Sequence, residues 1–203
     1  MARTGRPRNF DRDEAILKAM MLFWEHGFES TSLAQLRAVM GDISAASFYA
    51  AFDSKESLFR EVVDRYIATF GQATATLIDS SLAPREAIEQ ALRSSAKMQT
   101  EETHPSGCLL VLSASTCSFE NVHIREMLTK ERALTRSRLF DCIQRAVSNG
   151  ELPASTDITM LTAVFETFLL GISTQSRDGI SFATIDGAVT QVMGIWDRLA
   201  DSA

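Results

Sequence analysis

The chain has 203 residues, of which 45% are hydrophobic and 23% are charged, and its formal net charge is −6. This composition is typical of a folded globular protein and excludes a disordered one. The first residues are too charged for a signal peptide, and no apolar run approaches the roughly 18 residues of a membrane span, so a cytoplasmic protein without a membrane segment is expected.

The charge of the chain is unevenly distributed along its length. The first 12 residues hold Arg3, Arg6, Arg8 and Arg12 against Asp11, whereas the acidic excess lies in residues 61–203. A basic end on an acidic body predicts that this end binds an anion.

Helix signals recur along the whole chain, so an all-α fold is expected. The first helix shows apolar residues at helical spacing from Ile16 to Trp24 and a stop at Gly27. Serine or threonine caps precede the next short helices, and Pro84 suits the first turn of a later one. The sequence THPSG at 103–107 breaks the series. The expected helices cover residues 11–26, 33–40, 44–52, 54–78, 84–99, 108–119, 121–148, 157–176 and 182–200.

Two short helices joined by a glycine turn, after a longer helix and a basic tail, have the arrangement of a helix-turn-helix DNA-binding unit. Residues 27–59, GFESTSLAQLRAVMGDISAASFYAAFDSKESLF, resemble the signature of the TetR family of bacterial transcriptional regulators. The features that match are the Gly-Phe pair at 27–28, the turn glycine Gly41, the aromatic residues Tyr49 and Phe52, and the Ser-Lys pair at 54–55.

The resemblance implies an N-terminal arm and a three-helix helix-turn-helix domain in residues 1–59, a linking helix at about 54–78, and a helical effector-binding and dimerisation domain in residues 60–203. It also implies a homodimeric repressor that a small effector releases from a palindromic operator in double-stranded DNA. An enzyme is not expected, because the sequence lacks GxSxG, HExxH and phosphate-loop motifs. No cofactor is expected. An architectural DNA-binding protein without an effector pocket is the other alternative.

Side chains around the third helix are expected to contact DNA. Short side chains at its start let the backbone approach a major groove, and Tyr49 can bind a phosphate through its hydroxyl. Lys55 adds a cation at the start of the fourth helix, where free backbone N–H groups favour a phosphate. Read singly, Tyr49 is more often a half-buried packing residue and Lys55 a solvated surface charge. The predicted DNA-binding residues are Arg3, Arg6, Arg8, Thr31, Ser44, Ala45, Ala46, Ser47, Tyr49 and Lys55.

The turn of this unit departs from the family pattern. Gly41 and Tyr49 are eight positions apart where the pattern has seven, so the turn GDIS is expected to bulge by one residue. Arg37 stands where a small residue usually packs, and the usual lysine near the start of the recognition helix is replaced by Ala45 and Ala46. Base reading is therefore expected to rely on apolar contacts with thymine methyl groups, or on DNA shape and the arginine arm.

Apolar stripes on the last two helices predict a four-helix interface between two protomers, with an intrachain core as the alternative. The residues assigned to this dimer interface are Leu161, Phe165, Phe168, Ile172, Ile185, Val189, Val192 and Trp196. A pocket between the middle helices is expected to bind an apolar or aromatic effector, with plain core as the alternative. The residues assigned to this pocket are Phe70, Met98, Cys108, Leu109, Leu112, Phe119 and Phe140.

The cysteines offer a different way to sense a signal. Three cysteines without a CxxC pair argue against a disulfide framework and a zinc ribbon. Cys108 follows a Ser-Gly break, and a helix start there is expected to lower its pKa, which favours a thiol sensor. A soft-metal sensor that uses His104, Cys108, Cys117 and His123 matches no standard zinc spacing, and a buried cysteine is usually a small hydrophobic residue.

Overall fold

The computed structural model describes residues 10–115 and 118–201, and within these residues it contains helices and turns but no strand. The predicted all-α fold is therefore confirmed for this part of the chain. The elements are α1 (Arg12–Ser30), α2 (Leu33–Val39), α3 (Ala45–Phe52), α4 (Lys55–Ala68), the 3₁₀ segment η1 (Phe70–Ile78), α5 (Pro84–Thr100), α6 (Leu109–Ser115), the 3₁₀ turn η2 (Phe119–Asn121), α7 (Val122–Ser148), α8 (Ile158–Arg177) and α9 (Phe182–Ala200).

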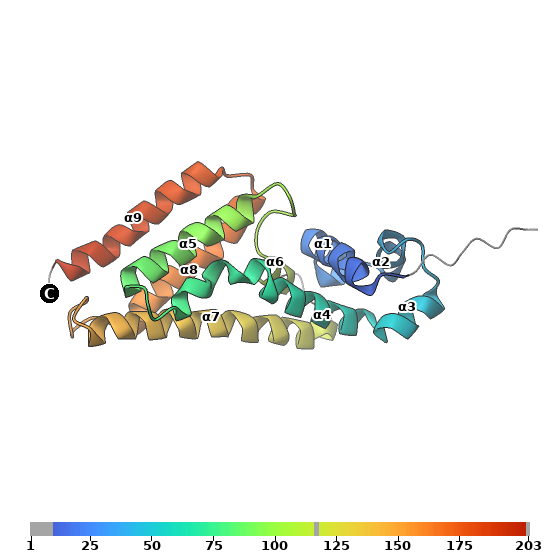
Figure 1. The fold of residues 1–203 in the computed structure, drawn as a ribbon, viewed down its shortest axis with the longest axis horizontal. Coiled ribbons are helices and arrows are strands. Elements are labelled where there is room, and N and C mark those ends of the chain that lie inside the picture. Colours follow the sequence, from blue (N-terminus) through green and yellow to red (C-terminus); the bar gives the residue numbers. More distant parts are fainter. Residues whose placement is uncertain (1–9, 116–117, 202–203) are drawn as a thin grey trace, which may run out of the picture.

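The molecule is elongated, with α1, α2 and α3 gathered at one end and the C-terminus at the other (Figure 1). The long helix α7 lies along the lower side of this view, and α5, α8 and α9 form the body at the end opposite α3. The segment from α4 to η1 runs from the helix-turn-helix end toward this body, so it connects the two ends.

Side-chain caps fix where the N-terminal helices begin. The Asp11 carboxylate accepts hydrogen bonds from the first-turn amides of α1, and Ser32 forms a reciprocal capping box with Gln35 at the start of α2. Ser44 and Ser54 cap α3 and α4 by accepting hydrogen bonds from the Ser47 and Ser57 amides. These caps satisfy backbone N–H groups that a helix leaves without partners, so the polar residues between the short helices define their ends.

The helix predicted over residues 54–78 is wrong as a single element. α4 ends at Ala68, Thr69 has φ −118° and ψ −87°, and η1 continues as a 3₁₀ segment from Phe70 to Ile78. The Thr69 hydroxyl donates to the carbonyl of Arg65 over 2.8 Å, which competes with the backbone pattern of the helix. The connection between the two ends of the molecule therefore changes from an α-helix to a 3₁₀ segment at Thr69.

Two clusters of buried side chains form the core. The first cluster joins α1 to α4 with Leu109 of α6 and with Ile124 and Leu128 of α7. The second joins α5, α7, α8 and α9 around Phe165 and Trp196. α8 is also long and apolar enough, by length and composition alone, to cross a membrane. In this fold its apolar face packs against the second cluster, which explains its composition.

Candidate functional site

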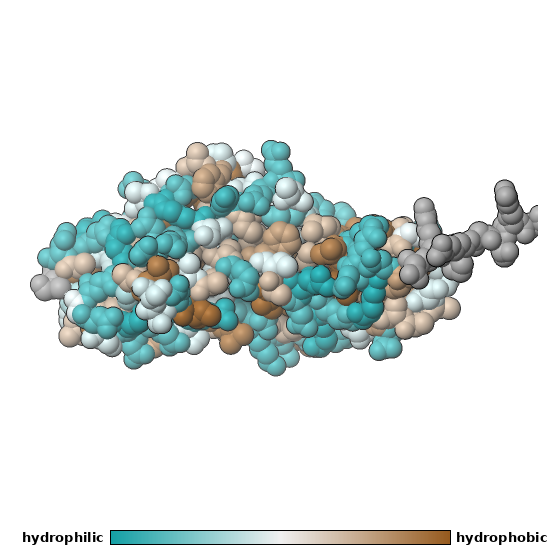
Figure 2. Space-filling model, viewed as in Figure 1, coloured by the Kyte–Doolittle hydropathy of each residue, from teal (hydrophilic) through white to brown (hydrophobic). Residues whose placement is uncertain are grey.

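The exposed face of α3 carries short side chains and one aromatic ring. Ser44 caps the helix by accepting a hydrogen bond from the Ser47 amide over 3.0 Å, and both serines are exposed. Ala46 is exposed as well, and Tyr49 is 50% exposed. The surface over α3 at this end of the molecule is largely white and pale brown in Figure 2. The side chains on this face are mostly short and all uncharged, so the helix can enter a DNA groove with this face forward.

The opposite face of α3 is anchored in the first cluster. Phe48 is 0% exposed and Phe52 is 2% exposed, and their rings lie 5.5 Å apart. Arg12 lies over the Phe52 ring, and it also pairs with Glu61 over 2.7 Å. The aromatic residues of SFYAAF therefore divide their roles, because two hold the helix in place and Tyr49 faces outward.

Two of the predicted DNA-binding residues have roles within the protein. Thr31 is fully buried, and its hydroxyl donates to the Gly27 carbonyl over 2.7 Å, so its predicted contact with DNA is wrong for the side chain. Lys55 is half-buried, with Nζ 4.4 Å from the centre of the Phe28 ring. Burial lowers the pKa of Lys55, and the nearby Glu29 carboxylate opposes this effect. Arg3, Arg6 and Arg8 lie outside the described residues.

The turn between α2 and α3 has unusual backbone geometry. Gly41 has φ 90° and Asp42 has φ 58°, so two successive residues adopt left-handed conformations. Arg37 in the last turn of α2 donates from Nε to the Ile43 carbonyl over 2.7 Å. This bond connects the last turn of α2 to the residue before the α3 cap. The bulge expected from the spacing of Gly41 and Tyr49 stays a prediction.

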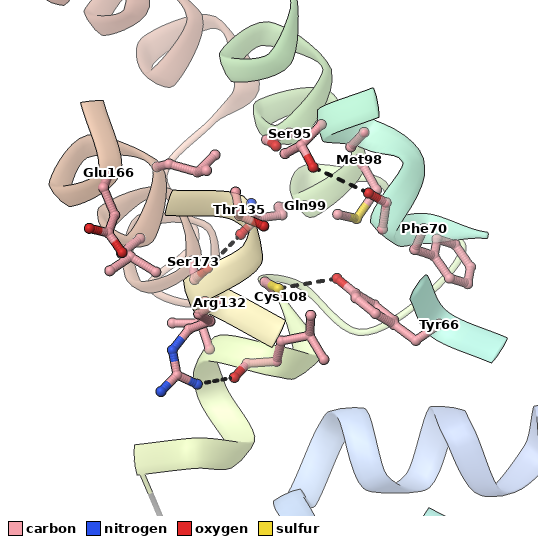
Figure 3. Close-up of a pocket in the computed structure, with 17 residues that line it drawn as sticks. Tyr66, Phe70, Ser95, Met98, Gln99, Cys108, Arg132, Thr135, Glu166 and Ser173 are labelled. Atoms are coloured by element: carbon pink, nitrogen blue, oxygen red, sulfur yellow. Dashed lines mark hydrogen bonds between the residues drawn. The ribbon is translucent and has the colours of Figure 1, made fainter. Parts of the chain in front are cut away.

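A cavity of about 80 Å³ lies between η1, α5, α6, α7 and α8 (Figure 3). Within it, the Tyr66 hydroxyl donates to the Cys108 sulfur over 3.2 Å, and the Ser173 hydroxyl donates to the side-chain oxygen Oε1 of Gln99 over 2.8 Å. The walls are mostly apolar. The lining residues are Tyr66, Phe70, Gly71, Ala73, Thr74, Ser95, Met98, Gln99, Cys108, Leu110, Val111, Arg132, Thr135, Glu166, Leu169, Leu170 and Ser173.

The predicted low pKa of the Cys108 thiol is wrong. Burial raises the pKa of Cys108 above its usual value, and the hydrogen bond from Tyr66 opposes this only in part. Burial likewise raises the pKa of Tyr66 well above the ordinary range. Cys108 directly precedes α6, which has only seven residues. The burial of the thiol therefore raises its pKa by more than the dipole of this short helix lowers it.

The pocket residues predicted from the sequence divide into two groups. Phe70, Met98 and Cys108 line the cavity. The other four do not, because Leu109 is buried in the first cluster, Leu112 lies against Gly107, Phe119 is 92% exposed, and Phe140 lines a separate surface hollow between α7 and α8. The predicted helix over 108–119 is shorter, since α6 ends at Ser115, and this places Phe119 outside it.

Two charged residues at the cavity were missed by the sequence reasoning. Arg132 and Glu166 line it, on α7 and α8 respectively. Glu166 Oε2 accepts a hydrogen bond from Arg136 over 2.7 Å, whereas its buried Oε1 has no partner among the described residues. Both residues sit in amphipathic helices where a charge is usually solvated, so only the packing of α7 against α8 brings them to the cavity.

The predicted dimer residues are mostly intrachain core, which was the alternative. Leu161, Phe165, Ile172, Ile185, Val189 and Trp196 are at most 4% exposed within one protomer, so their assignment to the dimer interface is wrong. The apolar stripes of α8 and α9 face α5 and α7. Phe168 and Val192 are only partly buried, and they line an open hollow of about 460 Å³ with Ala163, Val164 and Thr167.

The two histidines of the metal-sensor alternative have other partners in the protein. His104 stacks on Trp24 with ring centres 4.4 Å apart, and His123 pairs with Glu56 over 3.0 Å. Cys117 lies outside the described residues. Among the residues that the structure describes, no group of three or more His, Cys, Asp or Glu could hold a metal ion.

The comparisons with known proteins agree with this geometry. The family model described as bacterial regulatory proteins, tetR family, matches residues 16–62, and that of the tetracyclin repressor-like C-terminal domain matches residues 84–179. The chain is 33% identical to the HTH-type transcriptional repressor ComR of Escherichia coli over 196 residues, which cover 96% of this chain and 93% of ComR. It is 26% identical to the HTH-type transcriptional repressor BdcR of the same organism, over 87% of this chain and 84% of BdcR.

A solved structure resembles the chain over nearly its whole length. It is a cysteine mutant of the TetR family transcriptional regulator CifR, complexed with 26-base-pair double-strand operator DNA. The TM-score is 0.87 at 36% sequence identity, covering 94% of this chain and 100% of that chain. The chain therefore belongs to the TetR family of bacterial transcriptional regulators, as the motif at 27–59 predicted.

Proposed function

We propose that this protein is a homodimeric, cytoplasmic transcriptional repressor that binds a palindromic DNA operator through α3 and releases it when a small molecule occupies the cavity. The observation that carries the proposal is the exposed face of α3, where Ser44, Ala46, Ser47 and Tyr49 project from a helix anchored by buried Phe48 and Phe52. The solved complex of CifR with its operator DNA supports this mode of binding. No enzymatic activity belongs to the proposal.

The dimer interface is proposed on the outer faces of α8 and α9. Phe168 and Val192 lie on these faces around a hollow that stays open to solvent in the single protomer. An exposed apolar surface of this kind is typical of an interface between protomers. A two-fold dimer presents two copies of α3, and two copies match the inverted half-sites of an operator.

The effector is proposed to be a small, largely apolar molecule. An engineered cavity of about 150 Å³ holds benzene, so the cavity of about 80 Å³ holds a smaller molecule unless side chains move. An aromatic effector would therefore require rearrangement of its walls. Tyr66 and Phe70 form part of these walls, and their rings also contact Trp24 of α1 at 4.9 Å. A ligand that shifts them acts directly on the helix that supports the DNA-binding unit.

The experiment that tests the proposed function is nuclease protection of the DNA upstream of the protein's own gene. An inverted repeat protected at nanomolar protein would support it, and the absence of any sequence-specific protection would refute it. A thermal-shift screen of small apolar compounds tests the effector. Compounds that raise the melting temperature should also release the operator, because binding to one state shifts the equilibrium toward it.

A thiol-responsive repressor of the same fold is the second candidate, since Cys108 lines the cavity and lies within reach of anything that enters it. The raised pKa keeps its thiol protonated at neutral pH, which lowers its reactivity as a nucleophile. Because Cys108 lines the cavity, a reagent has to enter the cavity to reach the sulfur. Cys108→Ser should leave operator binding intact and abolish release by peroxide or an electrophile. If the wild-type protein shows no such release, this candidate fails.

A further inference from the structure

The turn between α2 and α3 contains two successive residues with positive φ, and a side-chain hydrogen bond spans these two residues. The Met40 and Gly41 amides close the end of α2 on the carbonyls of Leu36 and Ala38. The chain then passes through two left-handed residues, of which Asp42 is not glycine and so occupies a sparsely populated conformation. Such a conformation persists only where its surroundings hold it.

Arg37 supplies a bond that holds this turn. Its Nε donates to the Ile43 carbonyl over 2.7 Å, which is short for a nitrogen donor and typical of a charge-assisted hydrogen bond. The next residue, Ser44, is the cap of α3, so the bond lies one residue before the helix begins. Among the described residues no acidic side chain pairs with Arg37. Its hydrogen bond to the Ile43 carbonyl therefore does not compete with an ion pair in this part of the protein.

We propose that Arg37 is a positioning residue that fixes the spacing between α2 and α3 and thereby sets the preference for the operator over other DNA. The proposal rests on the proposed function of α3 as the DNA-reading helix. Phosphate contacts carry no sequence information, whereas contacts with base edges require the start of the helix at a defined place in the groove. Loss of the bond should therefore weaken operator binding far more than binding to random DNA.

Two substitutions of the same size separate this role from a direct phosphate contact. Arg37→Gln places an amide nitrogen where Nε stands and removes the charge. Arg37→Met removes the same charge and places a methyl group there. A matched control is Arg60→Met, because Arg60 pairs with Glu56 and its Nη1 lies 3.7 Å from Met127 of α7 rather than facing the turn. All variants are compared by titration of operator and random duplexes of equal length, with circular dichroism to verify folding.

The ratio of operator affinity to random-DNA affinity is the measured quantity. We expect Arg37→Gln to keep this ratio within about threefold of wild type, because its amide still donates to the Ile43 carbonyl. Arg37→Met should lower the ratio by about tenfold or more, because the donor is lost in each protomer. Arg60→Met should leave the ratio unchanged.

Three results would overturn the proposal. Equal ratios for Arg37→Gln and Arg37→Met would show that the donor at this position is irrelevant. An equal loss of affinity for both DNAs, with a shallower salt dependence, would show a phosphate contact. An unfolded Arg37→Met protein would show that the bond is needed for stability rather than for spacing. If wild type binds no operator at all, the proposed function fails instead, and this result is recognised before any variant is compared.

Discussion

The indole nitrogen of Trp24 donates a hydrogen bond to the carbonyl oxygen of Gly107 over 3.1 Å in the interior of the protein. Trp24 belongs to α1, and Gly107 directly precedes Cys108 of the cavity. The Gly107 amide in turn donates to the Gln99 carbonyl over 2.9 Å, with φ 84° at the glycine. A Cβ at position 107 would lie 2.6 Å from Leu112 and 2.9 Å from the Ser173 carbonyl. The bond therefore joins α1, at the DNA-binding end, to a crowded segment that directly precedes Cys108 of the cavity.

Replacing Trp24 with phenylalanine should lower the free energy of unfolding by more than the same replacement of a tryptophan that lacks such a bond. Trp24→Phe leaves the Gly107 carbonyl buried without its partner, which typically costs about 1–3 kcal/mol in addition to lost packing. Trp196→Phe is the matched control, because Trp196 is fully buried and its Nε1 has no partner among the described residues. Urea unfolding should show a larger loss for Trp24→Phe. Equal losses would mean that the indole bond contributes nothing.

Lys55 and Tyr49 should affect DNA binding in different ways. If the Lys55 ammonium leaves the Phe28 ring to bind a phosphate, Lys55→Ala should weaken operator and random DNA alike. The slope of log affinity against log salt should fall by about 0.9 per lost contact, about two units for a dimer. Lys55→Arg controls for charge and should retain the slope. A folded Lys55→Ala protein with unchanged affinity and slope would make Lys55 a structural cation of the Phe28 ring.

Tyr49→Phe should instead cost about 1.5–3 kcal/mol per protomer, because it removes one hydrogen bond to a charged phosphate. The salt slope should change little, because the hydroxyl itself carries no charge. The Tyr49 ring lies 5.6 Å from Phe48, and the phenylalanine variant preserves this contact. Gel-shift titration at several salt concentrations measures both quantities. A large change in the salt slope would contradict the assignment of this role to an uncharged hydroxyl.

Stability should decrease at alkaline pH because of Cys108. Burial raises the pKa of the folded-state thiol above its usual value of 9.0, so above that pH the unfolded chain ionises while the folded one stays protonated. The unfolded state then binds fewer protons, and the free energy of unfolding falls as pH rises, by up to about 1.4 kcal/mol per pH unit. The full contribution is present below pH 9.

Urea titrations between pH 7 and 10.5 test this expectation. Cys108→Ser should flatten the alkaline decline, because serine does not ionise in this range. The double variant with Tyr66→Phe added should flatten it further at the upper end, since burial also raises the pKa of Tyr66 from its usual 10.0. The same decline in all three proteins would assign it to other groups.

Aspartate substitutions should separate the surface of α8 from its core. Phe168→Asp should dissociate the proposed dimer into folded monomers, because Phe168 lines the open hollow with Val192. Phe165→Asp should unfold the protomer, because a fully buried unpaired carboxylate costs several kcal/mol. Sedimentation equilibrium with circular dichroism measures both effects. Folded dimers of Phe168→Asp would locate the interface elsewhere.

Local signals in the sequence were sufficient to predict most of the helices. Ser44, Ser54 and Pro84 mark helix starts through their own chemistry, and the structure confirms these starts at α3, α4 and α5. The change of helix type at Thr69 was missed because residues 54–78 contain no proline and keep an apolar face. A helix is divided there by a hydroxyl bond to its own backbone and by packing, neither of which periodicity reveals.

The candidate site was less predictable than the fold. Cys108, Met98 and Phe70 lie at the cavity, but Phe119 does not, because α6 ends at Ser115 and the Phe119 side chain is exposed. Periodicity shows that α8 and α9 have apolar faces without showing what those faces pack against. A residue such as Phe165 therefore fits a dimer interface and an intrachain core equally well until the packing of α5 and α7 is known.

The first cluster of buried side chains has a consequence for engineering. Leu109, Ile124 and Leu128 complete the hydrophobic interior around α1 and α4, although they follow residue 59 by many positions. A chimeric regulator assembled by exchanging residues 1–59 between relatives would leave that interior with foreign neighbours on one side. We therefore expect such chimeras to be insoluble or unresponsive unless α6 and the first turns of α7 are transplanted together with the N-terminal segment. The unit that would have to be exchanged therefore consists of two separate stretches of the chain, the N-terminal segment and the stretch from α6 to the first turns of α7. No single boundary in the sequence separates it from the rest of the protein.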